Sequence, residues 1–178
     1  MVWRRIGWVA ALAIWMFATL SLVGFAAGDP PGVATFPPNA PVHNWCGKAG
    51  AVGAFYLYQM FGYGAWMLMV LGGIWLGITA TGRRVPQMSV RVLGALVLAA
   101  AVAGFQSVIL PSSGPVPLLS GGLIGSVGTH RLGLSFGPAG TILVLLLAFC
   151  IGAVVSLDVW ALIVAAWTGR AIAGAGMT

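Results

Sequence analysis

Four long apolar runs, separated by polar or proline-rich segments, make up most of this chain. They lie at about residues 6–27, 50–80, 92–110 and 139–156. As a helix the first run would be about 33 Å long, enough to cross a hydrocarbon core of about 30 Å. The pattern therefore predicts an all-α membrane protein with four transmembrane helices.

The two long connections differ in their hydrophobic pattern. Residues 28–48 contain five prolines and no helical or strand period, which predicts an extended loop. Residues 111–138 are too polar to cross a membrane, but Leu119, Leu123 and Val127 recur at the spacing of one helix face. We expect a short amphipathic helix in this second loop, weakened by its glycines.

Three features leave alternatives open. The second run is longer than one crossing needs, so it must tilt or begin in the membrane interface. Residues 157–178 are predicted to bend along the cytoplasmic interface or to continue the fourth helix. Arg4 and Arg5 before an apolar run that ends in small residues also resemble a cleavable signal peptide. Under either reading of the first run, residues 28–48 lie outside the cytoplasm.

Composition and charge support the membrane assignment. The chain is 60% hydrophobic and 6% charged, with a mean hydropathy of +1.04, which excludes an ordinary soluble domain. The net charge of +6 comes from basic residues near the ends of the runs, where they set orientation. Only Lys48 and Arg131 fall in the loops on the outer side, so the excess of basic residues on the opposite side predicts that both termini are cytoplasmic. The predicted topology determinants are Arg4, Arg5, Arg83, Arg84, Arg91 and Arg170.

Candidate chemistry is sparse. His43 and Cys46 lie three residues apart, but His130 and Cys150 are the only other residues of these types, and a metal site needs three or four ligands. The topology separates the cysteines too widely for a disulfide, and an outward pH-sensitive pair of histidines stays open. No acid–base or nucleophilic constellation is present. We therefore expect no enzyme activity, metal or cofactor.

Polar and small residues within the runs indicate how the helices pack. Gln59 and Gln106 should face the bundle, because an unpaired amide in lipid costs several kcal/mol. Small residues allow two backbones to approach closely. The glycines expected to serve helix packing are Gly47, Gly50, Gly53, Gly62, Gly73 and Gly77.

The order of these features resembles a known family. NWCGKAGAVGAFYLYQMFGYGAW, at residues 44–66, is followed after a basic turn and a third run by SGGLIGSVGTHRLGLSFGPAGTILVLLL, at residues 120–147. Together they resemble the amino-terminal four-helix membrane domain of the FtsK/SpoIIIE septal DNA translocases. The resemblance covers about residues 4–169.

The resemblance implies a non-catalytic anchor and protein-interaction module in the bacterial inner membrane, at the division septum. In that family the domain anchors a hexameric cytoplasmic ATPase that acts in cell division and chromosome segregation. The expected partners are the lipid bilayer, further copies of the chain and other division membrane proteins. DNA would be reached only through a motor, which this chain lacks, because it has no G-x-x-x-x-G-K-[ST] motif.

Two further expectations concern the second loop and a competing function. The loop is a candidate contact for division proteins. Its candidate contact residues are Leu118, Leu119, Gly121, Gly122, Leu123 and Arg131. The alternative function is a small transporter or channel subunit, which would need a polar path at mid-membrane depth that only Gln59 and Gln106 could begin.

Overall fold

The computed structural model describes residues 2–32, 34–82 and 85–175, with side chains described up to residue 157. Within these residues the chain is helical, with no strand. Its elements are α1 (Val2–Val23), α2 (Gly47–Phe61), the 3-10 helix η1 (Gly62–Gly64), α3 (Ala65–Ala80), α4 (Met88–Ile109) and α5 (Gly122–Ala175).

Four helical stretches are long and apolar enough to cross a membrane, which confirms the predicted number of spans. They are Val2–Val23, Gly47–Ala80, Met88–Ile109 and Gly122–Leu157.

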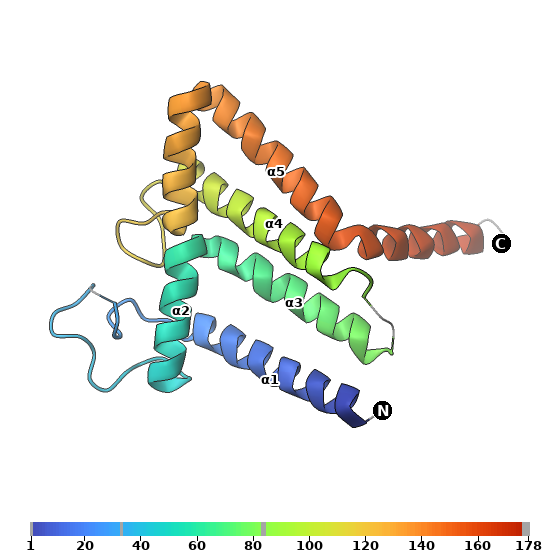
Figure 1. Ribbon diagram of the computed structural model, residues 1–178, viewed down its shortest axis with the longest axis horizontal. Coiled ribbons are helices and arrows are strands. Elements are labelled where there is room, and N and C mark those ends of the chain that lie inside the picture. The colour runs from blue at the N-terminus through green and yellow to red at the C-terminus, as the bar shows by residue number, and fades with distance from the viewer. Residues whose placement is uncertain (1, 33, 83–84, 176–178) are drawn as a thin grey trace.

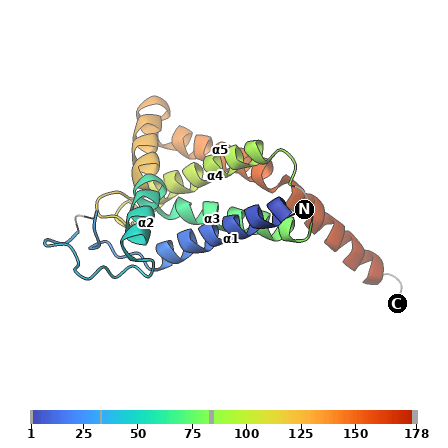
Figure 2. The same cartoon turned by 60° about the horizontal axis from the view of Figure 1, so that its bottom comes forward.

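The helices form a bundle with a second layer across one end. In Figure 1, α1, α3, α4 and the middle of α5 lie side by side, while α2 and the first part of α5 cross their ends. The same arrangement is seen after rotation in Figure 2. We call α2 and residues 122–136 the end layer. The connections 24–46 and 110–121 lie at this end, and the start of α1 lies at the opposite end of the bundle.

Two glycines separate the end layer from the spans. Gly62 has φ 53° and ψ −137°, and Gly137 has φ 67° and ψ −179°. Glycine adopts such angles readily because it has no Cβ, and Pro138 also prevents a regular helix at the second break. The second apolar run is therefore α2 and α3, joined by η1, and not one tilted helix. Residues 122–136 are helical and lead, across the break at Gly137, into the fourth span.

The last part of α5 combines features of the two readings of residues 157–178. It stays helical to Ala175, and it changes direction where it leaves the bundle, at the end where α1 begins (Figure 1). Ser156 lies within α5, where its hydroxyl donates to the carbonyl oxygen of Gly152 at 2.6 Å.

The chain contains an internal repeat, which our sequence analysis did not detect. Residues 47–62 and 122–137 both read G-x-x-G-x-V-G-x-x-x-L-x-x-x-F-G, 75 positions apart. The helices before them, α1 and α4, each have 22 residues and begin 86 positions apart. Each half is thus a span, a loop, an end-layer helix, a glycine break and a second span, running in the same directions (Figure 1).

Equivalent contacts show that the repeat extends to the packing. Cys46 Sγ lies 3.7 Å from the carbonyl oxygen of Phe17 at the start of α2. Its counterpart Gly121 is pressed against the carbonyl oxygen of Ala103, the counterpart of Phe17. The turn into the end layer therefore meets the preceding span at the same position in both halves.

The two halves differ in how closely their spans approach. A Cβ atom on Gly152 would lie 2.6 Å from the backbone nitrogen of Leu98 and 2.9 Å from the carbonyl oxygen of Gly94, so α4 and α5 pack tightly. Trp8, the counterpart of Gly94, instead donates its indole N–H to the carbonyl oxygen of Leu76 at 3.1 Å. Trp15 donates likewise to Met69, at 2.7 Å. Bulky indoles thus stand between α1 and α3.

Because α4 and α5 pack more closely than α1 and α3, the buried core lies mainly around α4. In the most apolar stretch of α1 only 11% of the residues are buried, against 44% in α4. One buried cluster, with Ala54, Tyr58 and Ala65, joins the end layer to the bundle. The other, with Leu71 and Leu98, joins α3 to α4.

Candidate functional site

The first loop is organised by a buried carboxylate. Asp29 Oδ1 accepts hydrogen bonds from Asn39 Nδ2 at 2.9 Å and from the backbone N–H of His43 at 3.0 Å. Its Oδ2 accepts from the backbone N–H of Asn44 at 2.8 Å. Burial alone would raise the pKa of Asp29, but these hydrogen bonds and the nearby His43 ring outweigh it and lower the pKa. The ionised carboxylate therefore holds the loop against the end of α1.

Asn44 connects that loop to both neighbouring helices. Its side-chain amide donates to the carbonyl oxygen of Ser21 at the end of α1, at 2.9 Å. Its side-chain oxygen accepts from the backbone N–H of Cys46, just before α2, at 2.9 Å. The His43–Cys46 stretch is thus a fixed turn that directs the chain into the end layer.

Metal-ligand residues do not gather near this turn. In the part of the chain that the structure describes, no three His, Cys, Asp or Glu residues lie close enough to hold a metal ion. Cys46 and Cys150 are both free thiols.

Gln106 occupies the point where the two glycine-rich turns meet. Its Oε1 accepts from the backbone N–H of Tyr63 at 2.8 Å, and its Nε2 donates to the carbonyl oxygen of Ser113 at 2.9 Å. The Tyr63 N–H is available because the helix breaks at Gly62. Gln106 therefore joins α4 to η1 and to the second loop.

Gln59 is placed differently from our expectation. It is half-buried and makes no hydrogen bond with any described residue. Among the residues that the structure describes, its amide therefore does not link two helices.

The predicted packing glycines divide into two groups. Gly50, Gly62 and Gly73 are pressed against neighbours, namely the Asn44 turn, the second loop and the Trp15 ring. Around Gly47, Gly53 and Gly77 a Cβ atom would meet nothing within 4 Å, so these three do not pack against another described segment. Sequence reasoning missed close contacts between helices that are made by Gly64, Gly94, Gly104, Gly125 and Gly152.

The second loop presents a smaller contact surface than predicted. Leu118 is fully exposed with φ 64°, and Leu123 and Arg131 are exposed on α5. Leu119, in contrast, packs against the core. Gly121 and Gly122 are buried and pressed against Ala103 and Met60, so they shape the loop and offer no surface to a partner.

Two further exposed apolar residues at this end were missed. Phe36, at 99% exposure, and Trp45, at 70%, lie on the first loop. Exposed apolar groups that gather at one end of a molecule typically mark a contact surface. With Leu118 they form what we call the apolar rim of the end layer.

Basic side chains lie at both ends of the bundle. Arg4, Arg5 and Arg91 lie at the end opposite the end layer, and Lys48 and Arg131 lie in the end layer. Arg91 is buried and donates from Nε to the carbonyl oxygen of Pro86 at 2.9 Å and from Nη1 to that of Ser156 at 3.4 Å. The other predicted determinants, Arg83 and Arg84 and the side chain of Arg170, lie outside the described residues.

These features define a class: a helical membrane domain with four spans and a structured layer across one end. The model of the 4TM region of DNA translocase FtsK/SpoIIIE matches residues 2–169, and the chain belongs to this family. This confirms the resemblance drawn from the sequence.

One relative illustrates how much of a family member the chain represents. The chain is 30% identical over 142 residues to the DNA translocase FtsK of Bradyrhizobium diazoefficiens. The alignment covers 78% of this chain and 17% of that protein. The chain thus spans less than a fifth of the length of this relative. No solved structure matches the chain.

Proposed function

We propose that this chain is the membrane anchor and interaction module of a septal DNA translocase in the bacterial inner membrane. The family match supports a membrane domain that is separate from an ATPase motor. The observation that carries the proposal is the course of α5, which leaves the bundle as a helix at the same end as the start of α1. This end is the attachment side for a motor.

The orientation follows from the distribution of charge. Arg4, Arg5 and Arg91 lie at the end from which α5 leaves, and basic residues favour the cytoplasmic side of short connections. The end layer then faces the periplasm.

The apolar rim of the end layer is our proposed contact for other division membrane proteins. Further copies of the chain are also proposed partners, because α1 leaves a wide apolar face exposed in the single chain. Through these contacts the domain would take part in cell division and chromosome segregation. A transporter role gains no support, because the amide of Gln106 is already bonded to the backbone on both sides.

Orientation is tested with single cysteines in a Cys46→Ser, Cys150→Ser background. Leu118→Cys lies at the end layer and Ser89→Cys at the start of α4, and both positions are exposed. We expect a membrane-impermeant maleimide to label only Leu118→Cys in intact cells. Labelling of Ser89→Cys alone would overturn the orientation.

The interaction role is tested by expressing the chain with a fluorescent reporter in dividing cells. We expect a septal band that is lost when Phe36, Trp45 and Leu118 are all changed to serine, with expression and helix content unchanged. Ser112→Ala, an exposed change in the same loop as Leu118, serves as the matched control. A uniform membrane signal from the unchanged chain would refute the septal role, and an unaffected triple variant would refute the rim.

A further inference from the structure

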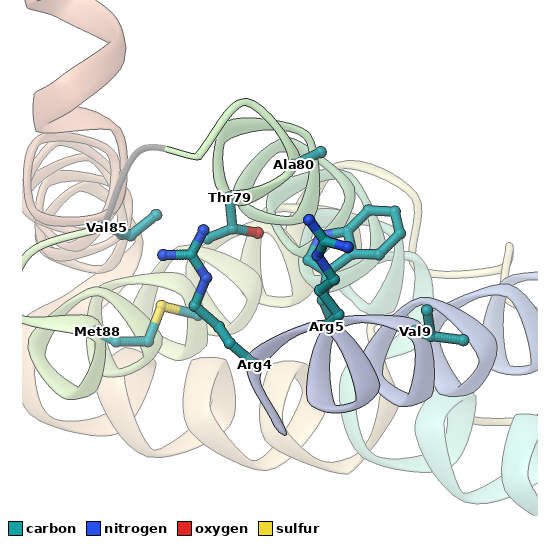
Figure 3. A pocket seen from close by; sticks show the side chains of 8 residues that line it. Arg4, Arg5, Val9, Thr79, Ala80, Val85 and Met88 are labelled. Carbon is teal, nitrogen blue, oxygen red and sulfur yellow. The ribbon is translucent and has the colours of Figure 1, made fainter. Parts of the chain in front are cut away.

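We propose that the cleft between α1 and α3, at the end opposite the end layer, binds the headgroup of one anionic phospholipid. The cleft has a volume of about 780 Å³. It is lined by two arginines of α1 and by apolar side chains from three segments (Figure 3). The residues that carry the argument are Arg4, Arg5, Trp8, Val9, Val85 and Met88.

The two arginines have no polar partner among the residues that the structure describes. Within the described residues, neither Arg4 nor Arg5 makes a hydrogen bond or an ion pair. The chain contains two acidic residues: Asp29 is at the other end of the molecule, and the side chain of Asp158 lies outside the described residues. The first turn of α1 also has no acidic residue, so two guanidinium groups lie near the positive end of the helix dipole with no described carboxylate beside them. An anion bound between the two guanidinium groups would reduce their repulsion from each other and from the helix dipole.

The second half of the repeat shows how such an arginine is satisfied when the cleft is narrower. Arg91 is the counterpart of Arg5 and is 6% exposed. It donates to the carbonyl oxygen of Pro86, just before α4, and to that of Ser156 in α5. Gly94 allows that approach, since it lies directly against Ser156. In the first half Trp8 stands in place of Gly94 and bonds to α3, so α1 and α3 stay apart and Arg5 remains exposed. The equivalent cleft of the second half is smaller, about 330 Å³, and its arginine is already bonded to carbonyl oxygens. The wide cleft with exposed arginines therefore belongs to the first half.

The walls of the cleft favour a lipid as the occupant. Figure 3 shows the guanidinium of Arg4 between Val85, Met88 and Thr79, and Val9 beside Arg5. The cleft lies where apolar spans end, the depth at which phosphates and acyl chains meet. Arginine binds phosphate with two parallel N–H bonds, and apolar walls would take the first part of an acyl chain. A soluble phosphate would use only the arginines.

The test measures lipid binding to the purified chain in a non-ionic detergent. Phosphatidylglycerol and phosphatidylcholine with the same acyl chains are titrated, and bound lipid is counted by native mass spectrometry. We expect one saturable phosphatidylglycerol molecule at each chain. Changing Arg4 and Arg5 together to glutamine should weaken it about 25-fold, at about fivefold for each basic residue near a headgroup.

Two variants separate the cleft from general charge attraction. Arg131→Gln removes one positive charge from the end layer and should leave the affinity for phosphatidylglycerol within about twofold of that of the unchanged chain. This is smaller than the weakening of about fivefold expected for each arginine that contacts a headgroup. Val9→Trp keeps every charge but fills the cleft, and should abolish the saturable site. Unchanged helix content by circular dichroism shows that each variant is folded.

Three results would overturn the proposal. One is an equal effect of Arg131→Gln and of the double arginine variant, which would mean non-specific attraction. The second is full binding by Val9→Trp, and the third is displacement of the lipid by inorganic phosphate but not by sodium chloride of equal ionic strength. The measurement uses the chain alone, so its outcome is independent of septal localisation.

Discussion

Replacement of Gln106 by leucine tests how the end layer is attached to the bundle. The change keeps an apolar side chain of similar size but removes the bonds to Tyr63 and Ser113. Ser113 is exposed, so water can replace the lost bond to its carbonyl oxygen and this loss is small. The N–H of Tyr63 lies outside a regular helix and is left with no acceptor.

The magnitude follows from these two unequal losses. Tyr63 is exposed but its N–H points to the buried Gln106 amide, so the bond is part-buried. A buried donor left without an acceptor costs about 1–3 kcal/mol, and a hydrogen bond between membrane helices contributes about 0.6 kcal/mol on average. We therefore expect Gln106→Leu to lower the free energy of unfolding by about 2 kcal/mol.

The assay is reversible unfolding in mixed micelles of increasing denaturing detergent, followed by circular dichroism. Gln59→Leu is the matched control, because Gln59 lies in an end-layer helix, is half-buried and makes no hydrogen bond with a described residue. It should change stability by less than about 0.5 kcal/mol, as for a position without such a feature. Equal losses in the two variants would show that the Gln106 bonds do not stabilise the junction.

Three other predictions concern single positions. Gly152→Ala should lower the free energy of unfolding by about 1–3 kcal/mol, because its Cβ would meet backbone atoms, whereas its repeat counterpart Gly77→Ala should be neutral or stabilising. Gly62→Ala should destabilise more than Gly137→Ala, since both have positive φ but only Gly62 is enclosed. The ionised Asp29 has a lowered pKa, so its contribution is complete above its unfolded pKa of about 3.9 and is lost as the pH falls through the folded value. Thermal melting at a series of pH values should therefore show a decline in acid that Asp29→Asn lacks.

Each of these predictions has an opposing outcome. Equal stability of the Gly152 and Gly77 variants would mean that α4 and α5 are not in close contact. A Gly137 variant less stable than the Gly62 variant would place the tighter break in the second half. An acid decline that persists unchanged in the Asp29 variant would assign it to another group.

The repeat was readable from the sequence, although hydropathy did not reveal it. Hydropathy reports how apolar a segment is, and both halves score as long apolar runs. A comparison of the chain with itself would have aligned Phe61-Gly62 with Phe136-Gly137 and indicated both helix breaks. The pairing of Trp8 with Gly94, which separates the wider cleft from the narrower one, comes instead from the starts of α1 and α4.

Local properties of the chain were sufficient for the four spans, the proline-rich first loop and the family. Crossing a membrane depends on the length and polarity of a continuous segment, and these can be read directly from the residues. The partners of a side chain depend on segments distant in the sequence, so only the tertiary structure decided which glycines pack and which do not. Gly77 and Gly152 have equivalent places in the repeat, yet one faces open space and the other touches backbone, because Trp8 holds α1 away from α3 while Gly94 admits α5.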